Sequence, residues 1–126
     1  MAFRDVDIVI HAAALKQVPS SEYNPFETIK TNVFGTQNVV ETCIKHNISS
    51  LLSLSTDKAS SPINLYGATK LCSDKITVSS ENIKGKSKVV SCVVRYGNVM
   101  ASRGSVIPML MKKKNHKYIE LTDKKM

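Results

Sequence analysis

The chain has 126 residues, a hydrophobic fraction of 42% and a formal net charge of +8, which suits one small globular domain. It has no apolar run near the roughly 18–20 residues that a membrane-spanning helix needs. Asp5 and Asp7 interrupt the early sequence, so we expect neither a signal peptide nor a membrane span, but a cytoplasmic protein. No aromatic interleaving or nucleic-acid-binding motif accompanies the late lysines, and we expect no nucleic-acid partner.

Short apolar runs and helical repeats alternate along the chain. Three runs predict buried strands, at Val6–Ile10, Leu51–Leu54 and Val89–Val94. Helices are predicted from Asn24-Pro25 to His46-Asn47, from Asn64 to near Asn82, and over Val106–Lys114. Tyr118–Leu121 is a candidate for one more strand.

This order of elements defines the fold class. Strands that alternate with crossover helices predict an α/β fold with a parallel sheet and right-handed connections. None of the five glycines belongs to a GxGxxG run, which normally opens a dinucleotide-binding fold. We therefore expect a single domain over residues 1–126 that is a partial Rossmann-like sheet, lacking the N-terminal Gly-rich βαβ unit.

Three smaller features lead to structural expectations. The three cysteines, Cys43, Cys72 and Cys92, fit neither a zinc spacing nor a disulfide framework, so we expect buried or inert thiols and no metal site. Gly35 interrupts a helix at a cost of about 1 kcal/mol relative to alanine, which suggests a close approach between helix and sheet. Asn32 is expected to serve the helix and the sheet rather than chemistry.

The candidate catalytic residues follow the second predicted strand. Thr56, Asp57 and Lys58 end that strand, and ligands of open α/β sheets bind beyond the carboxyl ends of the strands. Tyr66 and Lys70 are four residues apart on the next helix and therefore share a face. A nearby ammonium favours the phenolate form of a tyrosine, whose pKa is otherwise near 10. Taken alone, the Tyr–Lys pair also fits an ordinary helix face, and Asp57–Lys58 also fits a surface ion pair.

Four segments carry a resemblance to a known family: HAAALKQVP, NPFETIKTNVFGTQNV, LSTDKASSPINLYGATKLCSDK and VVRYGNVMASRGSVIP. Together they resemble the extended short-chain dehydrogenases/reductases, and within them the inverting UDP-N-acetylglucosamine 4,6-dehydratases. The STDKA…PxNxYGxTK segment is the most specific. The resemblance implies an NADP-dependent lyase (or one that uses NAD) of glycan or polysaccharide biosynthesis, which acts on a UDP-sugar and is a homo-oligomer when full length.

The resemblance also implies a role for each catalytic residue. Tyr66 would deprotonate the sugar 4-hydroxyl while the cofactor takes the C4 hydride, and Thr56 would hydrogen-bond the same oxygen. Lys70 would hold the nicotinamide ribose and lower the pKa of Tyr66. Lys58 would remove the C5 proton, and a protonated Asp57 would assist the loss of the 6-hydroxyl as water.

The remaining site residues are expected to bind the cofactor and the substrate. Tyr66 and Lys70 are expected to bind the cofactor, as are His11, Ala12 and Ala13 at the end of the first strand. Small side chains there would let the backbone approach the cofactor. Tight packing explains these small residues equally well. The residues expected near the substrate are Lys16, Asn98 and Arg103. For Asn98 the resemblance implies a contact with the nucleotide-sugar diphosphate.

Three hypotheses for function stay open at this point. The first is a nucleotide-sugar 4,6-dehydratase, of which this chain is the central catalytic segment. The second is a nucleotide-sugar 4-epimerase, since epimerases of the superfamily also use Tyr-x-x-x-Lys. The third is a non-enzymatic fragment, because the family's Gly-rich half and most of its substrate region are missing, and we expect this chain to be inactive alone.

Overall fold

The computed structural model describes residues 2–102 and 105–119. The chain divides into two compact units, Met1–Tyr96 and Gly97–Met126. The single domain expected over residues 1–126 stays a prediction. Of the helices in the described ranges, none combines the length and the hydrophobicity needed to cross a bilayer.

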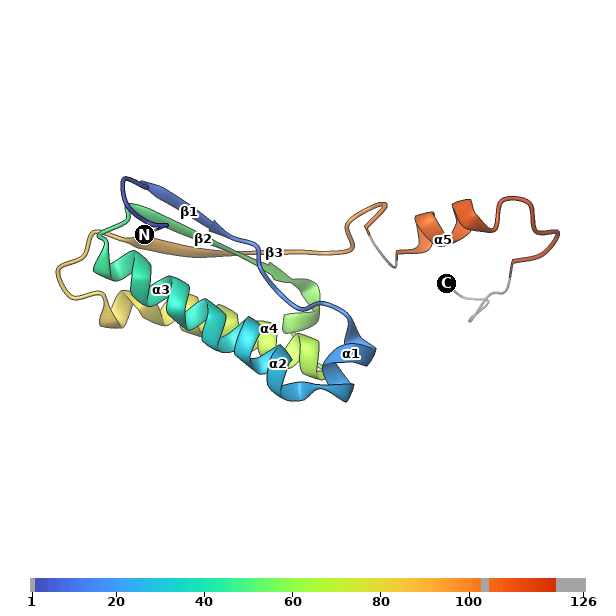
Figure 1. The fold of residues 1–126 in the computed structure, drawn as a ribbon, viewed down its shortest axis with the longest axis horizontal. Helices are drawn as coiled ribbons and strands as arrows, with labels where there is room; N and C mark the ends of the chain where they lie inside the picture. The colour runs from blue at the N-terminus through green and yellow to red at the C-terminus, as the bar shows by residue number, and fades with distance from the viewer. Residues whose placement is uncertain (1, 103–104, 120–126) are drawn as a thin grey trace. The chain divides into compact units, whose positions relative to one another are not determined.

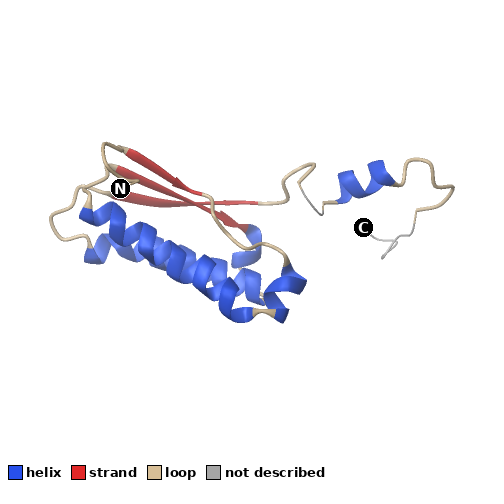
Figure 2. Cartoon of the chain, viewed as in Figure 1, coloured by secondary structure: helices blue, strands red, loops and turns tan. Residues whose placement is uncertain are grey.

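The first unit contains a three-stranded parallel sheet in the order β1-β2-β3 (Figure 1). The strands are β1 (Ile8–His11), β2 (Ser50–Thr56) and β3 (Val90–Tyr96). Both strand pairs are parallel, with Ile10 opposite Leu52 and Leu52 opposite Cys92. Each connection between strands passes through helices (Figure 2). The predicted parallel α/β fold is therefore confirmed, and the three predicted strands are present with ends shifted by one or two residues.

The connection from β1 to β2 contains one more helix than expected. It runs through α1 (Val18–Tyr23), α2 (Pro25–Ile29), the π-helical turn η1 (Lys30–Phe34) and α3 (Gly35–Lys45). The predicted helix begins at Pro25, although the Asn24 side chain makes no capping hydrogen bond. The short α1 escaped prediction because its six residues, VPSSEY, show no apolar repeat.

The second connection positions the candidate site. It consists of the 3₁₀ turn η2 (Asp57–Ala59) and the 19-residue helix α4 (Leu65–Ile83). Asn64 caps α4 as predicted, since its side-chain oxygen accepts a hydrogen bond from the Gly67 N–H at 2.9 Å. The second unit contains α5 (Val106–Lys112). Tyr118 and Ile119 lie outside any strand, and the rest of the candidate strand up to Leu121 lies outside the described residues.

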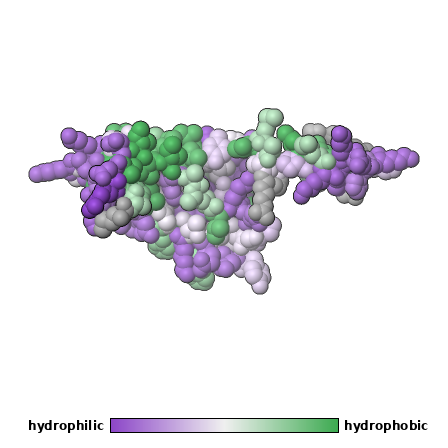
Figure 3. All heavy atoms as spheres, turned by 45° about the horizontal axis from the view of Figure 1, so that its top comes forward, coloured by the Kyte–Doolittle hydropathy of each residue, from purple (hydrophilic) through white to green (hydrophobic). Residues whose placement is uncertain are grey.

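Helices cover one face of the sheet, as Figure 1 shows for α3 and α4. A small core of buried residues lies between them, namely Val40, Cys43, Ile48, Leu51 and Val89. The opposite face is open, with Ile8 and Ile10 each 63% exposed and Val90 60% exposed, and Figure 3 shows apolar side chains gathered over the strands. The expectation of strands buried on both faces is therefore wrong for this face, because the helices of the first unit form only one covering layer.

The structure corrects the expected burial of two cysteines and the expected close approach at Gly35. Cys43 is buried as expected, but Cys72 and Cys92 are exposed. A Cβ added at Gly35 would meet the Lys30 carbonyl oxygen at 3.6 Å, which is an ordinary van der Waals contact. Gly35 therefore marks no close approach of helix and sheet.

Candidate active site

A hydrogen-bonded group ends strand β2. The Thr56 hydroxyl donates to Asp57 Oδ1 at 2.9 Å, and Lys58 Nζ donates to the same oxygen at 3.1 Å. Thr56 is buried, whereas the Asp57 and Lys58 side chains are 54% and 45% exposed. The hydrogen bond from Lys58 lowers the pKa of Asp57 most, and the hydrogen bond from Thr56 lowers it further. These contacts favour the carboxylate form of Asp57, whereas the role that the resemblance implies requires the protonated form.

Tyr66 and Lys70 lie on the first turns of α4 and are both buried, with 9% and 4% of their surface exposed. Lys70 Nζ donates to the Leu54 carbonyl oxygen at 2.7 Å, which ties α4 to β2. Burial lowers the pKa of Lys70, and the nearby Asp74 carboxylate opposes this effect.

The pKa of Tyr66 moves in the direction opposite to the expected one. Burial raises the pKa of Tyr66, a hydrogen bond with Thr56 works against this, and Tyr96 and Asp57 raise it further. The ammonium of Lys70 is bonded to Leu54 O and does not offset the burial. The expected lowering of the Tyr66 pKa by Lys70 is therefore wrong for the protein without ligands.

Gly67 brings these two groups of residues together. A Cβ at this position would lie 2.5 Å from the Lys58 carbonyl oxygen and 3.1 Å from Pro62 Cβ. Real Cβ atoms do not approach a backbone oxygen so closely, so only glycine lets the start of α4 pack directly on the η2 turn. The glycine beside Tyr66 thus holds Lys58 and Tyr66 in one site.

The loop after β1 begins at the same edge of the sheet. His11 is buried, and its Nε2 lies 3.0 Å from Thr36 Oγ1. The Thr36 hydroxyl donates its own proton to the Asn32 carbonyl at 2.7 Å, so His11 Nε2 must be the donor to Thr36. This hydrogen bond requires a proton on Nε2. Burial lowers the pKa of His11 most and the charge of Lys70 lowers it further, so the neutral Nε2–H tautomer is favoured.

The other residues expected near the cofactor and the substrate lie in three different parts of the chain. Ala12, Ala13 and Lys16 are exposed in the loop after β1. Asn98 is an exposed loop residue of the second unit. Arg103 lies outside the described residues. The roles of these residues, like that of His11, stay predictions.

Asn32 has a larger role than its expected place in helix and sheet suggested. Its Oδ1 accepts from the Leu15 N–H at 2.7 Å, and its Nδ2 donates to the Leu15 carbonyl and to Thr69 Oγ1, each at 3.0 Å. The side chain thus clamps the loop after β1 to the residue next to Lys70. Sequence reasoning missed this clamp because its partners are 17 and 37 residues away along the chain.

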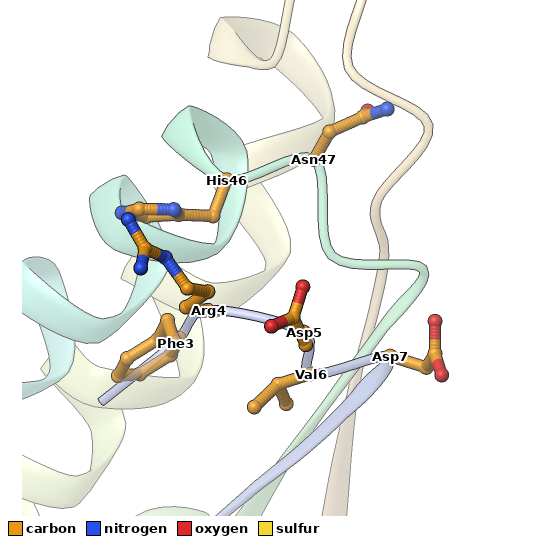
Figure 4. Close-up of a pocket in the computed structure, with 7 residues that line it drawn as sticks. All are labelled: Phe3, Arg4, Asp5, Val6, Asp7, His46 and Asn47. Carbon is orange, nitrogen blue, oxygen red and sulfur yellow. The ribbon is translucent and has the colours of Figure 1, made fainter. Parts of the chain in front are cut away.

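A separate hollow of about 560 Å³ lies at the amino end of β1 (Figure 4). It is lined by Phe3, Arg4, Asp5, Val6, Asp7, His46 and Asn47. Figure 4 shows the Arg4 side chain extending toward His46, whereas Asp7 points away from them. Ligands of parallel sheets bind at the carboxyl ends of the strands, so this hollow is not the candidate active site. In the ranges 2–102 and 105–119, no cluster of three or more His, Cys, Asp or Glu side chains is arranged to hold a metal ion.

The parallel sheet, the Thr at the end of β2 and the Tyr–Lys pair on the following helix define a class: the extended short-chain dehydrogenases/reductases. Within this class, a family described as polysaccharide biosynthesis protein matches residues 1–126, and the chain belongs to it. The resemblance to the inverting 4,6-dehydratases is likewise confirmed. The chain is 52% identical to a Campylobacter jejuni UDP-N-acetylglucosamine 4,6-dehydratase (inverting), with an alignment that covers 100% of this chain and 38% of that protein.

Other similar proteins include a 4-epimerase as well as dehydratases. A UDP-glucose 4-epimerase of Rickettsia canadensis is 45% identical over 99% of this chain and 37% of that protein. The structure of Pen from Bacillus thuringiensis has a TM-score of 0.88 at 45% identity, covering 97% of this chain and 38% of that one. DesIV of Streptomyces venezuelae, a dTDP-glucose 4,6-dehydratase solved with NAD, has a TM-score of 0.73 at 24% identity over 90% of this chain and 40% of that one, a likeness of fold. The chain thus spans about 38% of the length of the dehydratase that it matches.

Proposed function

We propose that this chain is the catalytic segment of a nucleotide-sugar 4,6-dehydratase, an NADP-dependent lyase that converts UDP-N-acetylglucosamine to a 4-keto-6-deoxy sugar with inversion at C5. The observation that carries the proposal is the placement of Asp57 and Lys58, which lie beside the Tyr66–Lys70 helix at the end of β2. The identity of 52% to a dehydratase of that specificity supports it. We place the activity in cytoplasmic glycan or polysaccharide biosynthesis, with a homo-oligomer as the complete form.

The residues at the edge of the sheet fit a nicotinamide cofactor. Ala12 and Ala13 have small, exposed side chains that leave the backbone accessible. Leu54 O takes one of the three N–H groups of the Lys70 ammonium, and the others are suited to ribose hydroxyls. A nicotinamide held there would accept the C4 hydride and return it to C6, and its positive charge would favour the Tyr66 phenolate.

Tyr66 and Thr56 act at the sugar C4. Tyr66 takes the proton of the 4-hydroxyl as the C4 hydride leaves, which gives a 4-ketone. Thr56 interacts with Tyr66, so its hydroxyl would lie beside the same sugar oxygen and hydrogen-bond it. The ketone acidifies the proton at C5, which is the next to leave.

Asp57 and Lys58 provide the acid and the base for the elimination. In the structure they form an ion pair, in which Lys58 holds the proton that Asp57 needs. Transfer of this proton along the 3.1 Å hydrogen bond gives a neutral amine and a carboxylic acid. The amine then removes the C5 proton, and the acid protonates the 6-hydroxyl, which departs as water and leaves a C5=C6 double bond. Hydride addition at C6 and protonation of C5 from the opposite face complete the 4-keto-6-deoxy sugar. Substrate that covers the half-exposed pair favours the neutral forms, because charged forms are disfavoured by desolvation.

A 4-epimerase is the second candidate, favoured by the identity of 45% to the Rickettsia canadensis protein. The two reactions differ at C5, because an epimerase leaves the C5–H bond intact. The test uses a chimera in which this chain replaces the matching segment of the Campylobacter jejuni dehydratase. With UDP-N-acetylglucosamine in D₂O we expect a 4-keto-6-deoxy product with deuterium at C5. A 4-epimer without deuterium would replace the proposal with the epimerase.

Two variants of the chimera test the assigned roles. Asp57→Asn should lower dehydration by at least about 100-fold, the usual contribution of a general acid. Glu27→Gln serves as the matched control, because it removes another exposed carboxylate–lysine pair, Glu27–Lys30, with a similar distance of 3.0 Å. The third hypothesis, a non-enzymatic fragment, concerns the 126-residue chain alone, for which we expect no measurable NADP⁺ binding by calorimetry. Tight binding by this chain would contradict that expectation.

A further inference from the structure

Asp74 is a buried carboxylate one helical turn after Lys70 on α4, with 5% of its surface exposed. Its Oδ2 accepts a hydrogen bond from Arg95 Nε at 2.8 Å, which joins α4 to β3. Its Oδ1 is also buried and accepts no hydrogen bond from the described residues. A buried carboxylate is costly unless its charge is balanced. Arg95 balances one side of Asp74, and Lys70 is the cationic residue one helical turn before it on α4.

Arg95 makes a second contact that reaches the other half of the site. Its Nη1 donates to Ser60 Oγ at 3.2 Å. Ser60 ends the η2 turn, and its N–H donates to the Asp57 carbonyl oxygen at 3.0 Å. One guanidinium thus connects the helix that carries Lys70 with the turn that carries Asp57.

Several charged or titratable groups face Lys70 from different elements. His11 on β1 senses the charge of Lys70, Asp74 on α4 acts on Lys70, and Arg95 on β3 pairs with Asp74. Burial lowers the pKa of Lys70, and Asp74 raises it. Asp74 therefore favours the charged form of an ammonium that its surroundings disfavour.

We propose that Asp74 is the counter-charge of the buried Lys70, and that Arg95 braces both halves of the site by holding Asp74 and the Asp57–Lys58 turn against the same helix. Both are positioning residues, since Asp74 lies one turn after Lys70 and Arg95 contacts Asp74 and Ser60 rather than substrate. The brace itself rests on contacts in the structure. Only its effect on turnover rests on the proposed dehydratase function.

The first test is the titration of Lys70 in the 126-residue chain, followed by NMR of ¹⁵N-labelled lysine side chains. Asp74→Asn should lower the pKa of Lys70, whereas Arg95→Gln should raise it, because Asp74 then acts on Lys70 without a competing cation. A role in packing alone predicts no such opposite shifts. Glu81→Gln is the matched control, since it removes an acid from the same helix that pairs with Lys84, and it should leave Lys70 unchanged.

The second test follows the turn by hydrogen exchange of the Ser60 amide. Arg95→Gln should speed this exchange by about tenfold, the factor expected for losing a contact worth about 1.4 kcal/mol. If Asp74→Asn does not fold, Arg95→Gln still decides the outcome by both readouts. An unchanged or lowered Lys70 pKa together with unchanged exchange in Arg95→Gln would overturn the brace.

The third test uses the dehydratase chimera. Asp74→Asn should lower kcat more than it changes KM and should move the alkaline limb of the pH profile to lower pH, while Asp74→Glu should restore part of the rate. A chimera that is inactive before any substitution contradicts the proposed function, and the Lys70 titration then still tests the brace. An active chimera whose kcat and pH profile are unchanged by Asp74→Asn contradicts the brace alone.

Discussion

Replacement of Gly67 by alanine tests whether the close contact between η2 and α4 holds the site together. The added Cβ would lie 2.5 Å from Lys58 O and 3.1 Å from Pro62 Cβ, so the backbone must move. Overpacking of this kind costs about 1–3 kcal/mol, while alanine regains at most about 1 kcal/mol of helix propensity. We expect Gly67→Ala to lower the free energy of unfolding by about 1–2 kcal/mol.

Gly35→Ala is the matched control, because it is the same substitution in a helix without the close contact. Gly35 has a helical backbone, with φ −59° and ψ −43°, and an added Cβ would meet Lys30 O at 3.6 Å. This variant should gain about 0.5–1 kcal/mol. Urea unfolding of the 126-residue chain, followed by circular dichroism, measures both changes as shifts of the midpoint. A midpoint for Gly67→Ala at or above that of the parent chain would refute the reasoning.

Three further predictions concern buried polar groups. Because the folded pKa of His11 lies below its ordinary 6.5, the unfolded chain takes up a proton first as the pH falls. The contribution of His11 to the free energy of unfolding should therefore be full above about pH 6.5 and decrease as the pH drops toward the folded pKa. Urea midpoints between pH 5 and 8 measure this dependence, which His11→Gln should abolish. Asn32→Ala should speed exchange of the Leu15 amide by about tenfold, the value of one lost hydrogen bond, and unchanged exchange contradicts the clamp. Burial raises the pKa of Cys43 to about 11, so an aromatic disulfide reagent at pH 8 should modify only the two exposed thiols of the native chain; modification of all three would be contrary to this.

The sequence predicts the parts of this fold that depend on local signals. Short β-branched runs indicated the three strands, and Asn64 indicated the start of α4 that its hydrogen bond to Gly67 now confirms. The face shared by Tyr66 and Lys70 follows directly from their spacing on that helix. The exposed face of the sheet was not predictable in this way, because an apolar run looks the same whether one layer of helices covers it or two.

The charge states were harder to predict, because they depend on contacts between distant residues. The Lys70 ammonium bonds to a carbonyl 16 residues earlier, and Arg95 pairs with an acid 21 residues earlier. Neither contact has a sequence signature. For this reason the Tyr–Lys spacing predicted a lowered Tyr66 pKa, whereas burial raises it in the structure. Spacing predicts which residues lie together, whereas burial and distant contacts shift their pKa values.

The site therefore consists of two pairs with different access to water. Tyr66 and Lys70 are buried and fixed by bonds to the sheet and its connections, whereas Asp57 and Lys58 remain half exposed. Water stabilises the charged forms of an exposed pair, so on the proposed function the proton moves to Asp57 only after substrate excludes the solvent. On the proposed function, elimination is then tied to substrate binding, while the buried pair is in place before substrate arrives. This order protects the 4-keto intermediate, because the base that acts on C5 forms only when the sugar covers it.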